Sequence, residues 1–164
     1  MKRIIVCDTG PLIHLSEAGI INYVKLAGDV FIPKNVAQEF LAKGLNKQLP
    51  DWIIEKNLNS SSQKKAIMWQ KDIDKGEAAA IALAIQMSAD WLLTDDALAR
   101  RFGQAIGLEI HGSVGLLLWA IATGKVEDES TAIDQLMTLS HTSLWISDKV
   151  LFQAHKTIKS FFAK

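Results

Sequence analysis

The chain has 164 residues, of which 49% are hydrophobic and 22% are charged, and its 18 basic and 18 acidic residues give a formal net charge of zero. This balance excludes a disordered chain, and the length suits one domain. Zero net charge argues against a protein that binds nucleic acid by charge alone, but not against an enzyme that binds phosphate through metal ions.

The predicted elements alternate between strands and helices along the chain. Short apolar runs predict strands at 4–7, 29–32, 52–54, 91–94 and 108–110. Capping residues and hydrophobic periodicity predict helices after Asp8, at 34–41, 74–88, 97–106 and 113–123, and around 129–139 and 147–162. The polar segment that begins at Ser60 gives no clear signal. Alternating strands and helices favour an α/β fold with a parallel sheet covered on both faces.

Nothing in the chain suggests export or a membrane. The single cysteine, Cys7, excludes an internal disulfide bond and favours a reducing compartment. The apolar run near the N-terminus ends at Asp8, which is too early for the core of a signal peptide. The longest strongly apolar stretch, residues 114–123, is about half as long as a membrane span. We therefore expect a cytoplasmic protein with no membrane partner.

Acidic residues follow two of the predicted strands. Asp8 comes directly after the first strand, and Asp95 and Asp96 follow the strand that ends at Thr94. Open parallel sheets bind ligands outside the carboxyl ends of their strands. Each of these residues also has an alternative explanation as a helix cap, which is the commoner reason for an aspartate after a strand.

Two helical glutamates are also open to two explanations. Glu77 lies on a predicted helix that is apolar on nearly every side, where a carboxylate is costly unless a cation meets it. The same residue fits a capping box with Asp74, and the two explanations are equally good. Glu39 borders the apolar stripe of its helix, although a single helical glutamate is usually a solvated surface charge.

Taken together, these acids indicate one chemistry. Acids at two strand ends and near the starts of two helices can converge at one edge of a parallel sheet, where unpaired carboxylates repel each other. A divalent ion such as Mg²⁺ or Mn²⁺ removes this repulsion, because these ions prefer carboxylate oxygens and also bind substrate phosphates. Bound ions can generate hydroxide from water and stabilise the attacking and leaving oxygens.

Four segments, in this order, resemble the PIN-domain family. They are IVCDTGPLI at 5–13, Ile32-Pro33 with Val36 and Glu39, GEAAAIALA at 76–84, and LLTDD at 92–96 with Ala99 and Arg100. The similarity covers about residues 3–124 and is greatest to prokaryotic VapC-type ribonuclease toxins. The remaining segment, about 125–164, adds helices that the motifs do not assign.

The resemblance implies one PIN-like domain over residues 1–164, with a central parallel sheet of about five strands and helices on both faces. It also implies a negatively charged pocket with Mg²⁺ or Mn²⁺ and endonucleolytic hydrolysis of RNA phosphodiester bonds. The implied catalytic residues are Asp8, Glu39, Glu77 and Asp96. The implied metal ligands come from Asp8, Glu77, Asp95 and Asp96, with Asp95 as the competitor of Asp96 for the fourth position.

The chain departs from the family pattern at one place. Relatives often carry Asn or Ser two residues after the first acid, where this chain has Gly10. Such neighbouring groups tune metal affinity, so Gly10 can weaken the site, and Thr9 is a candidate for supplying the hydroxyl instead. Arg100 is a candidate for contacting an RNA phosphate, with a solvated helix face as an equally good alternative.

Three functions follow from these observations. The first is a metal-dependent ribonuclease, which includes the toxin of a toxin–antitoxin pair with an antitoxin protein as partner. The second is a catalytically weak PIN-like module that binds RNA or a protein, which Gly10 keeps open. The third is another phosphoryl-transfer or receiver-type protein that uses Asp8. An Asp-nucleophile phosphatase would want a second Asp at position 10, which argues against this third function.

The remaining aromatic residues and histidines carry weaker signals. The histidines are scattered and are predicted to lie at the surface or at helix ends. The five tryptophans can stack bases, but packing in the core or at a subunit interface is the better prediction. PIN relatives commonly dimerise, so we expect a homodimer to which the apolar segment 150–162 contributes.

Overall fold

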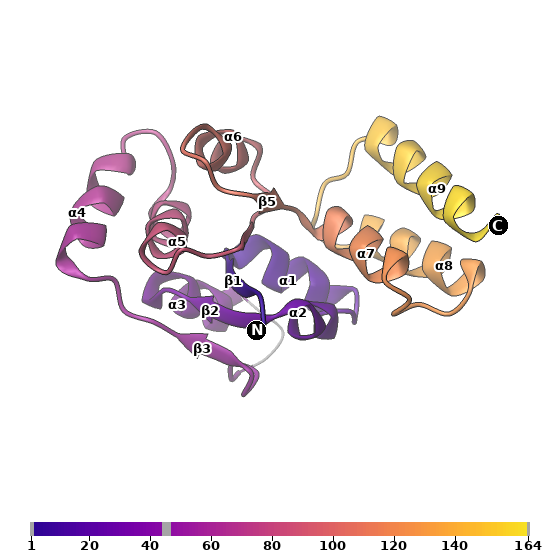
Figure 1. The fold of residues 1–164 in the computed structure, drawn as a ribbon, viewed down its shortest axis with the longest axis horizontal. Coiled ribbons are helices and arrows are strands. Elements are labelled where there is room, and N and C mark those ends of the chain that lie inside the picture. Colours follow the sequence, from indigo (N-terminus) through magenta and orange to yellow (C-terminus); the bar gives the residue numbers. More distant parts are fainter. Residues whose placement is uncertain (1, 44–46, 164) are drawn as a thin grey trace.

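The computed structural model describes residues 2–43 and 47–163, and Figure 1 shows a central sheet with helices on both sides. The strands are β1 (Ile4–Cys7), β2 (Asp29–Ile32), β3 (Ile53–Glu55), β4 (Trp91–Leu93) and β5 (Ile110–His111). They form a five-stranded sheet in the order β3-β2-β1-β4-β5, in which every neighbouring pair is parallel. The predicted α/β fold is therefore confirmed.

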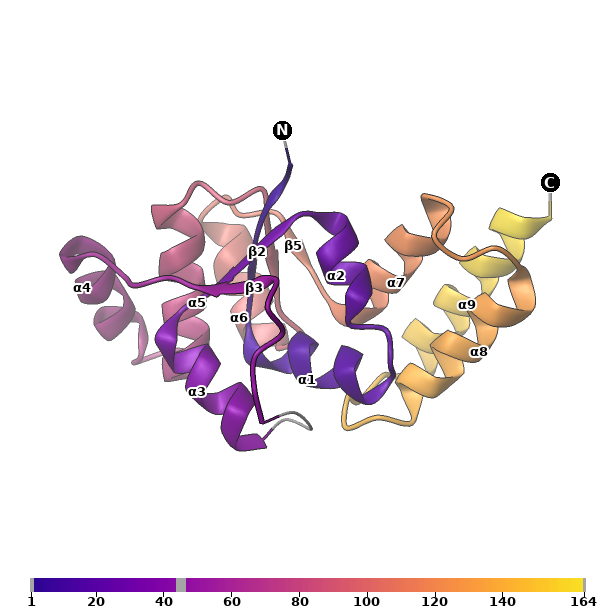
Figure 2. The same cartoon turned by 90° about the horizontal axis from the view of Figure 1, so that it is seen from below.

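The helices form layers around this sheet. They are α1 (Thr9–Glu17), α2 (Asn22–Ala27), α3 (Lys34–Lys43), α4 (Ser60–Trp69), α5 (Lys75–Gln86), α6 (Ala97–Ala105), α7 (Ser113–Ala122), α8 (Glu129–Ser140) and α9 (Asp148–Phe162). Helix α5 packs on β1 and β4 and is flanked by α3, α4 and α6, whereas α2 packs on β2 and α7. Helices α7, α8 and α9 pack on one another at the end of the molecule that holds the C-terminus (Figure 2).

The core explains why β1 and α5 lie at the centre. Ile5, Val6 and Cys7 are fully buried, as expected for a strand with a neighbour on each side. Helix α5 is buried along residues 78–84, where its many alanines allow a close approach to the sheet. Full burial of a large aliphatic side chain contributes about 1.5–3 kcal/mol. Within residues 2–43 and 47–163, no helix is long and apolar enough to cross a membrane.

Some elements differ from the prediction. Helix α2 was not predicted, because it has only six residues and no side-chain cap. Helix α4 begins at the unassigned Ser60, where Asn59 accepts a hydrogen bond from the Ser62 amide as its cap. The predicted strand at 108–110 is instead Ile110–His111, because the Leu108 amide still bonds to the Gly103 carbonyl at the end of α6.

The topology positions a site between β1 and β4. The strand order reverses there, since β2 lies on one side of β1 and β4 on the other. Ligands of open α/β sheets bind in the crevice outside the carboxyl ends of the strands at such a switch point. The Asp8 amide donates a hydrogen bond to the Leu93 carbonyl at 2.9 Å, so the residues that follow both strands are neighbours.

Candidate active site

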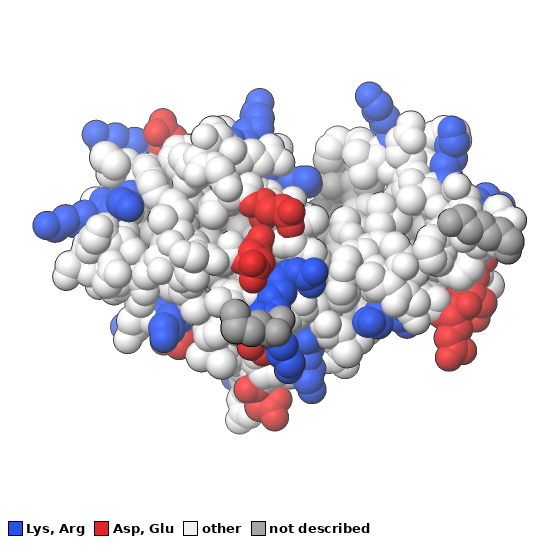
Figure 3. Space-filling model, in the orientation of Figure 1, with Lys and Arg blue, Asp and Glu red and all other residues white. Residues whose placement is uncertain are grey.

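A pocket of about 490 Å³ opens at the carboxyl ends of β1 and β4. Its acidic lining residues come from several separate elements: Asp8, Glu39, Asp74, Glu77, Asp95 and Asp96. Figure 3 views the molecule from the amino ends of the strands, so this pocket lies on the face that is turned away there. The acids singled out in the sequence therefore line one pocket, on the same side of the sheet.

Asp8 lies at the buried floor of this pocket, with 7% of its surface exposed. One of its oxygens accepts a hydrogen bond from the Thr9 amide at 2.8 Å, and the other accepts one from the Thr94 hydroxyl at 3.0 Å. The pKa of Asp8 is raised from 3.8 to about 6, chiefly by burial. The two hydrogen bonds oppose this rise, and the charges of Asp74 and Glu39 add to it. Asp8 thus caps α1 and also faces the pocket.

Glu77 likewise combines the two roles that its sequence position predicted. The capping box is present: the Glu77 amide donates to Asp74 at 2.8 Å, and Oε1 of Glu77 accepts from the Asp74 amide at 3.1 Å. The pKa of Glu77 is raised from 4.5 to about 7, chiefly by burial. The capping hydrogen bond from Asp74 opposes this rise, and the charges of Asp74, Asp96 and Asp8 add to it. Capping occupies Oε1, so Oε2 is the oxygen available to a ligand.

Glu39 reaches the pocket from α3. The Thr9 hydroxyl donates a hydrogen bond to its Oε2 at 3.3 Å, so the candidate hydroxyl at position 9 meets an acid of the pocket. Its Oε1 lies against the backbone of Gly76, where a Cβ atom would collide with it. The absence of a side chain at position 76 therefore allows this carboxylate to approach the start of α5.

Asp95 and Asp96 have different environments. Oδ1 of Asp95 accepts from the Ser113 amide at 2.7 Å, and Oδ2 accepts from the Ser113 hydroxyl at 2.6 Å and lies 2.7 Å from Nδ1 of His14. Asp95 thereby caps α7, whose own N-cap residue, Gly112, has no side chain to do so. Asp96 is exposed and uses Oδ2 to cap α6 through the Ala99 amide at 2.8 Å.

Comparison with known families agrees with this geometry. A family model described as a PIN domain matches residues 4–160. The chain belongs to the PIN-domain family. This match extends through α8 and into α9, well beyond the segments that carry the resemblance in the sequence. A comparison with curated proteins gave no match.

The PIN domain has further pocket residues that the sequence alone did not single out. Asp74 lines the pocket in addition to capping α5. His14 lies in the last turn of α1, as expected for a helix-end histidine, but it faces the pocket with only 15% of its side chain exposed. A signal for His14 was available, since it is four residues after Gly10 and shares its helix face. Trp145, from the segment between α8 and α9, lines the rim.

Arg100 lies outside the acidic pocket of the PIN domain. It lines a neighbouring pocket of about 340 Å³, which shares Asp95, Ala97, Leu144 and Trp145 with the acidic one. The only Lys or Arg among the described residues that line the acidic pocket is Lys43. The ion pairs found in the described ranges link none of these acids to a Lys or Arg side chain. The pocket therefore keeps a surplus of negative charge.

The donor set of the PIN domain suits a divalent ion of the Mg²⁺ or Mn²⁺ kind. Carboxylate oxygens dominate the pocket, and these ions bind such oxygens together with several waters. Among the described residues, no three His, Cys, Asp or Glu side chains already converge as a preformed metal site. Burial raises the pKa of the Cys7 thiol, as do the charges of Asp8 and Asp95, so this thiol stays protonated and acts neither as ligand nor as nucleophile.

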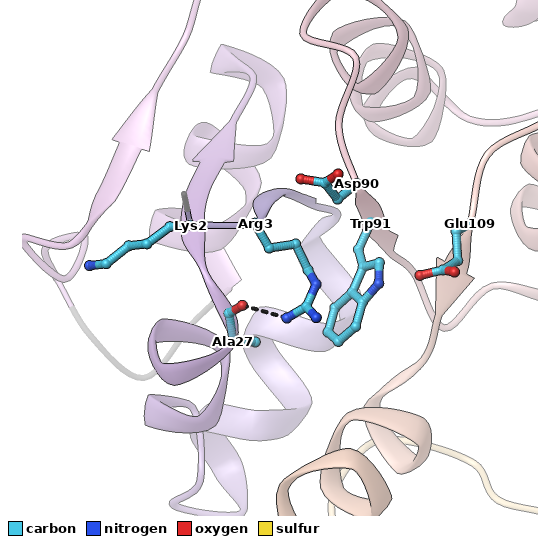
Figure 4. Close-up of a pocket in the computed structure, with 6 residues that line it drawn as sticks. All are labelled: Lys2, Arg3, Ala27, Asp90, Trp91 and Glu109. Atoms are coloured by element: carbon cyan, nitrogen blue, oxygen red, sulfur yellow. Dashed lines mark hydrogen bonds between the residues drawn. The ribbon is translucent and has the colours of Figure 1, made fainter. Parts of the chain in front are cut away.

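A second pocket lies at the opposite, amino end of the strands (Figure 4). It is larger, about 670 Å³, but its polar groups are engaged in holding the fold. Arg3 lies over the Trp91 ring at 3.9 Å and donates a hydrogen bond to the Ala27 carbonyl at 2.8 Å. Asp90 accepts a hydrogen bond from the Ile4 amide at 2.7 Å. This pocket shows no convergence of like charges, so the acidic pocket is the better candidate.

Proposed function

We propose that this PIN domain is a metal-dependent endoribonuclease that hydrolyses RNA phosphodiester bonds in the acidic pocket. The observation that carries the proposal is the meeting of Asp8, Glu39, Glu77 and Asp96 in one pocket from four separate elements. Such a concentration of carboxylates is unfavourable without a cation. Burial is the main cause of the raised pKa values of Asp8 and Glu77, and the charges of neighbouring acids add to it.

We assign the following roles in metal binding and in activation of water to the residues of the pocket. Asp8 and Asp96 would hold the ion, and Glu77 would offer its free Oε2 as a further ligand. Glu39, which accepts a hydrogen bond from the Thr9 hydroxyl, would orient the attacking water and accept its proton. Bound Mg²⁺ or Mn²⁺ would activate water and stabilise the charge that develops on the phosphate oxygens.

Asp95 has a different proposed role from Asp96. Both oxygens of Asp95 already accept hydrogen bonds, and a half-buried carboxylate that caps a helix is not easily turned toward an ion. Asp96 retains Oδ1 beside the pocket. We therefore assign the fourth acid to Asp96 and a positioning role to Asp95.

Gly10 is compatible with this proposal. A Cβ atom at position 10 would meet His14 and Asp95 only at 3.6 Å or more, so no catalytic carboxylate is packed against the bare backbone. Hydroxyl groups reach the acids from other positions, namely Thr9 to Glu39 and Thr94 to Asp8. Although Gly10 departs from the family pattern, Glu39 and Asp8 therefore still accept hydrogen bonds from hydroxyl groups.

The biological setting follows from the sequence resemblance. The similarity to VapC-type toxins supports a toxin with an antitoxin protein as partner, acting in the cytoplasm. A homodimer through α9 is supported by Val150, Phe152 and Phe161, which this helix leaves exposed. Dependence of the solution mass on these three side chains would support the homodimer, and a monomeric mass at all concentrations would contradict it.

Cleavage of single-stranded RNA by purified protein tests the proposed activity. Wild type is expected to cleave with Mg²⁺ or Mn²⁺ and not with a chelator. Asp8→Asn and Asp96→Asn are expected to lose at least about 100-fold in rate, since even outer-shell partners of a metal are worth about 10–100-fold. Both changes keep a capping oxygen. Asp134→Asn, an exposed acid on α8 outside the pocket, is the matched control and is expected to cleave normally.

Two results would contradict the proposal. Cleavage that persists in chelator or in Asp8→Asn would exclude the assigned metal site. RNA binding without cleavage in wild type would instead favour the catalytically weak binding module, for which the lack of a preformed metal site among the described residues is the supporting observation.

A further inference from the structure

Trp145 differs from the other four tryptophans of the chain. Trp91 and Trp119 pack edge to face, Trp69 packs in the same way on Phe102, and Trp52 packs against the core. Trp145 is 83% exposed, and no aromatic or cationic partner is found for it in the described ranges. Tryptophan is enriched at interfaces, because its ring has a large apolar face and a polar N–H.

The position of Trp145 connects two pockets. It lines the acidic pocket and also the neighbouring pocket that holds Arg100, and Leu144 beside it lines both as well. The two pockets are therefore adjacent, with Trp145 on the wall that they share; together they are called the groove below.

The chemistry of the groove changes along its length. One end is dominated by carboxylates and would receive phosphate only through bound cations. The other end combines the Arg100 guanidinium with the apolar side chains Val114, Ile146 and Val150. A nucleotide has two matching parts: an anionic phosphate and a base with a flat apolar face. Aromatic side chains next to a cationic group are the usual platform for unpaired bases.

We propose that Trp145 stacks on an unpaired base of an RNA strand whose neighbouring phosphodiester lies in the acidic pocket, with Arg100 at the far end of the same groove. This inference rests on the proposed function for the cleavage step, and it requires the base next to the cleaved bond to be unpaired. A duplex keeps its bases stacked on each other and has no free face to offer.

Equilibrium binding in a cleavage-impaired background tests the stacking contact separately from catalysis. The probe is a short fluorescein-labelled single-stranded RNA of mixed sequence, and its anisotropy is followed with Mn²⁺ present. The proteins all carry Glu39→Gln, which removes the proposed base and keeps the proposed metal ligands, alone or combined with Trp145→Ala, Trp145→Phe or Ile67→Ala. Ile67, on α4, is 67% exposed and lines neither pocket, so its removal is the control for loss of a large exposed apolar side chain.

The expected result is that Trp145→Ala weakens RNA binding about 5- to 150-fold, the range that one stacked base contributes. Trp145→Phe is expected to retain most of the affinity, and Ile67→Ala all of it. An abasic nucleotide placed at successive positions is expected to weaken binding at one position only. That loss should be absent once Trp145 is alanine, because the base and the indole ring act as a pair.

Other outcomes distinguish a failure of the proposed stacking contact from a failure of the proposed nuclease activity. Unchanged affinity in Trp145→Ala, with wild-type cleavage intact, overturns the stacking contact and leaves the nuclease in place. Lost affinity in Trp145→Ala without any wild-type cleavage supports the stacking contact and overturns the nuclease. An RNA affinity independent of Trp145, together with a solution mass that falls in Trp145→Ala, would show that Trp145 packs against a second copy and overturns the proposal. Failure of every variant to bind RNA overturns both.

Discussion

Replacing Gly76 with alanine tests whether the position of Glu39 matters for activity. A Cβ atom at position 76 would collide with Oε1 of Glu39 and lie 3.2 Å from its Cδ, whereas ordinary contact begins near 3.4 Å. The obstructing atoms belong to the flexible end of a side chain, so the carboxylate can move aside by roughly 1 Å without disturbing the backbone. A misplacement of about 1 Å in an active site can lower the rate about 100-fold.

The same substitution is expected to leave the fold intact. Gly76 lies in the first turn of α5, and alanine is up to about 1 kcal/mol more favourable than glycine within a helix. We therefore expect Gly76→Ala to lose about 100-fold in RNA cleavage while its midpoint of thermal unfolding stays equal or rises. This pattern would separate catalytic geometry from stability.

A double-mutant cycle with Glu39→Gln provides the control for Gly76→Ala. If alanine at position 76 acts only by moving Glu39, the double variant should be little slower than Glu39→Gln alone. Cleavage rates and thermal unfolding curves are measured for wild type, the two single variants and the double variant. Full activity in Gly76→Ala would mean that displacing Glu39 does not impair cleavage, and losses that multiply in the double variant would mean that alanine at position 76 does not act through Glu39.

Three further predictions follow from the acids of the pocket. Because the folded-state pKa values of Asp8 and Glu77 are raised to about 6 and about 7 from 3.8 and 4.5, these groups should make the metal-free protein lose stability as pH rises from about 4 to about 7. Mn²⁺ should restore this stability most strongly above pH 7, as thermal unfolding at several pH values would show. Thr94→Val removes the hydroxyl that lowers the pKa of Asp8, so the rise of the cleavage rate with pH should move to higher pH. Asp95→Ala removes the cap of α7 and should lower the free energy of unfolding by about 2 kcal/mol in denaturant titrations.

Each of these predictions has a contradicting result. A metal-free protein that is more stable at pH 8 than at pH 5, with no difference from a variant that carries both Asp8→Asn and Glu77→Gln, would exclude the pH effect. An unchanged pH profile in Thr94→Val would mean that its hydroxyl does not act on Asp8. Asp95→Ala with wild-type stability would mean that the contacts to Ser113 do not hold α7.

The elements that the sequence predicted are those with local signals. Continuous apolar runs marked β1, β2 and β4, and the Asp74–Glu77 capping box marked the start of α5. Because parallel strands bring their carboxyl ends to one edge, the meeting of Asp8 with Asp95 and Asp96 followed from strand positions alone. Capping and pocket lining proved compatible at Asp8 and Glu77, which the sequence had left as alternatives.

The features that the sequence did not predict depend on contacts between distant residues. Asp95 caps α7 through Ser113, 18 positions away, and nothing local marks this pairing. Nδ1 of His14 lies 2.7 Å from Oδ2 of Asp95 in the pocket, and this contact requires the register of β1 and β4. No feature of the sequence separates Trp145 from the other four tryptophans. Only the packing of the C-terminal helices leaves it exposed beside the groove.

Titration of the metal-free protein with Mn²⁺, followed by electron paramagnetic resonance, measures whether the acidic pocket holds a divalent ion. We expect wild type to bind Mn²⁺, Asp8→Asn and Asp96→Asn each to weaken this binding at least about tenfold, and Asp134→Asn to leave it unchanged. Equal Mn²⁺ binding by wild type and Asp8→Asn, or none by wild type, would contradict the proposed metal site.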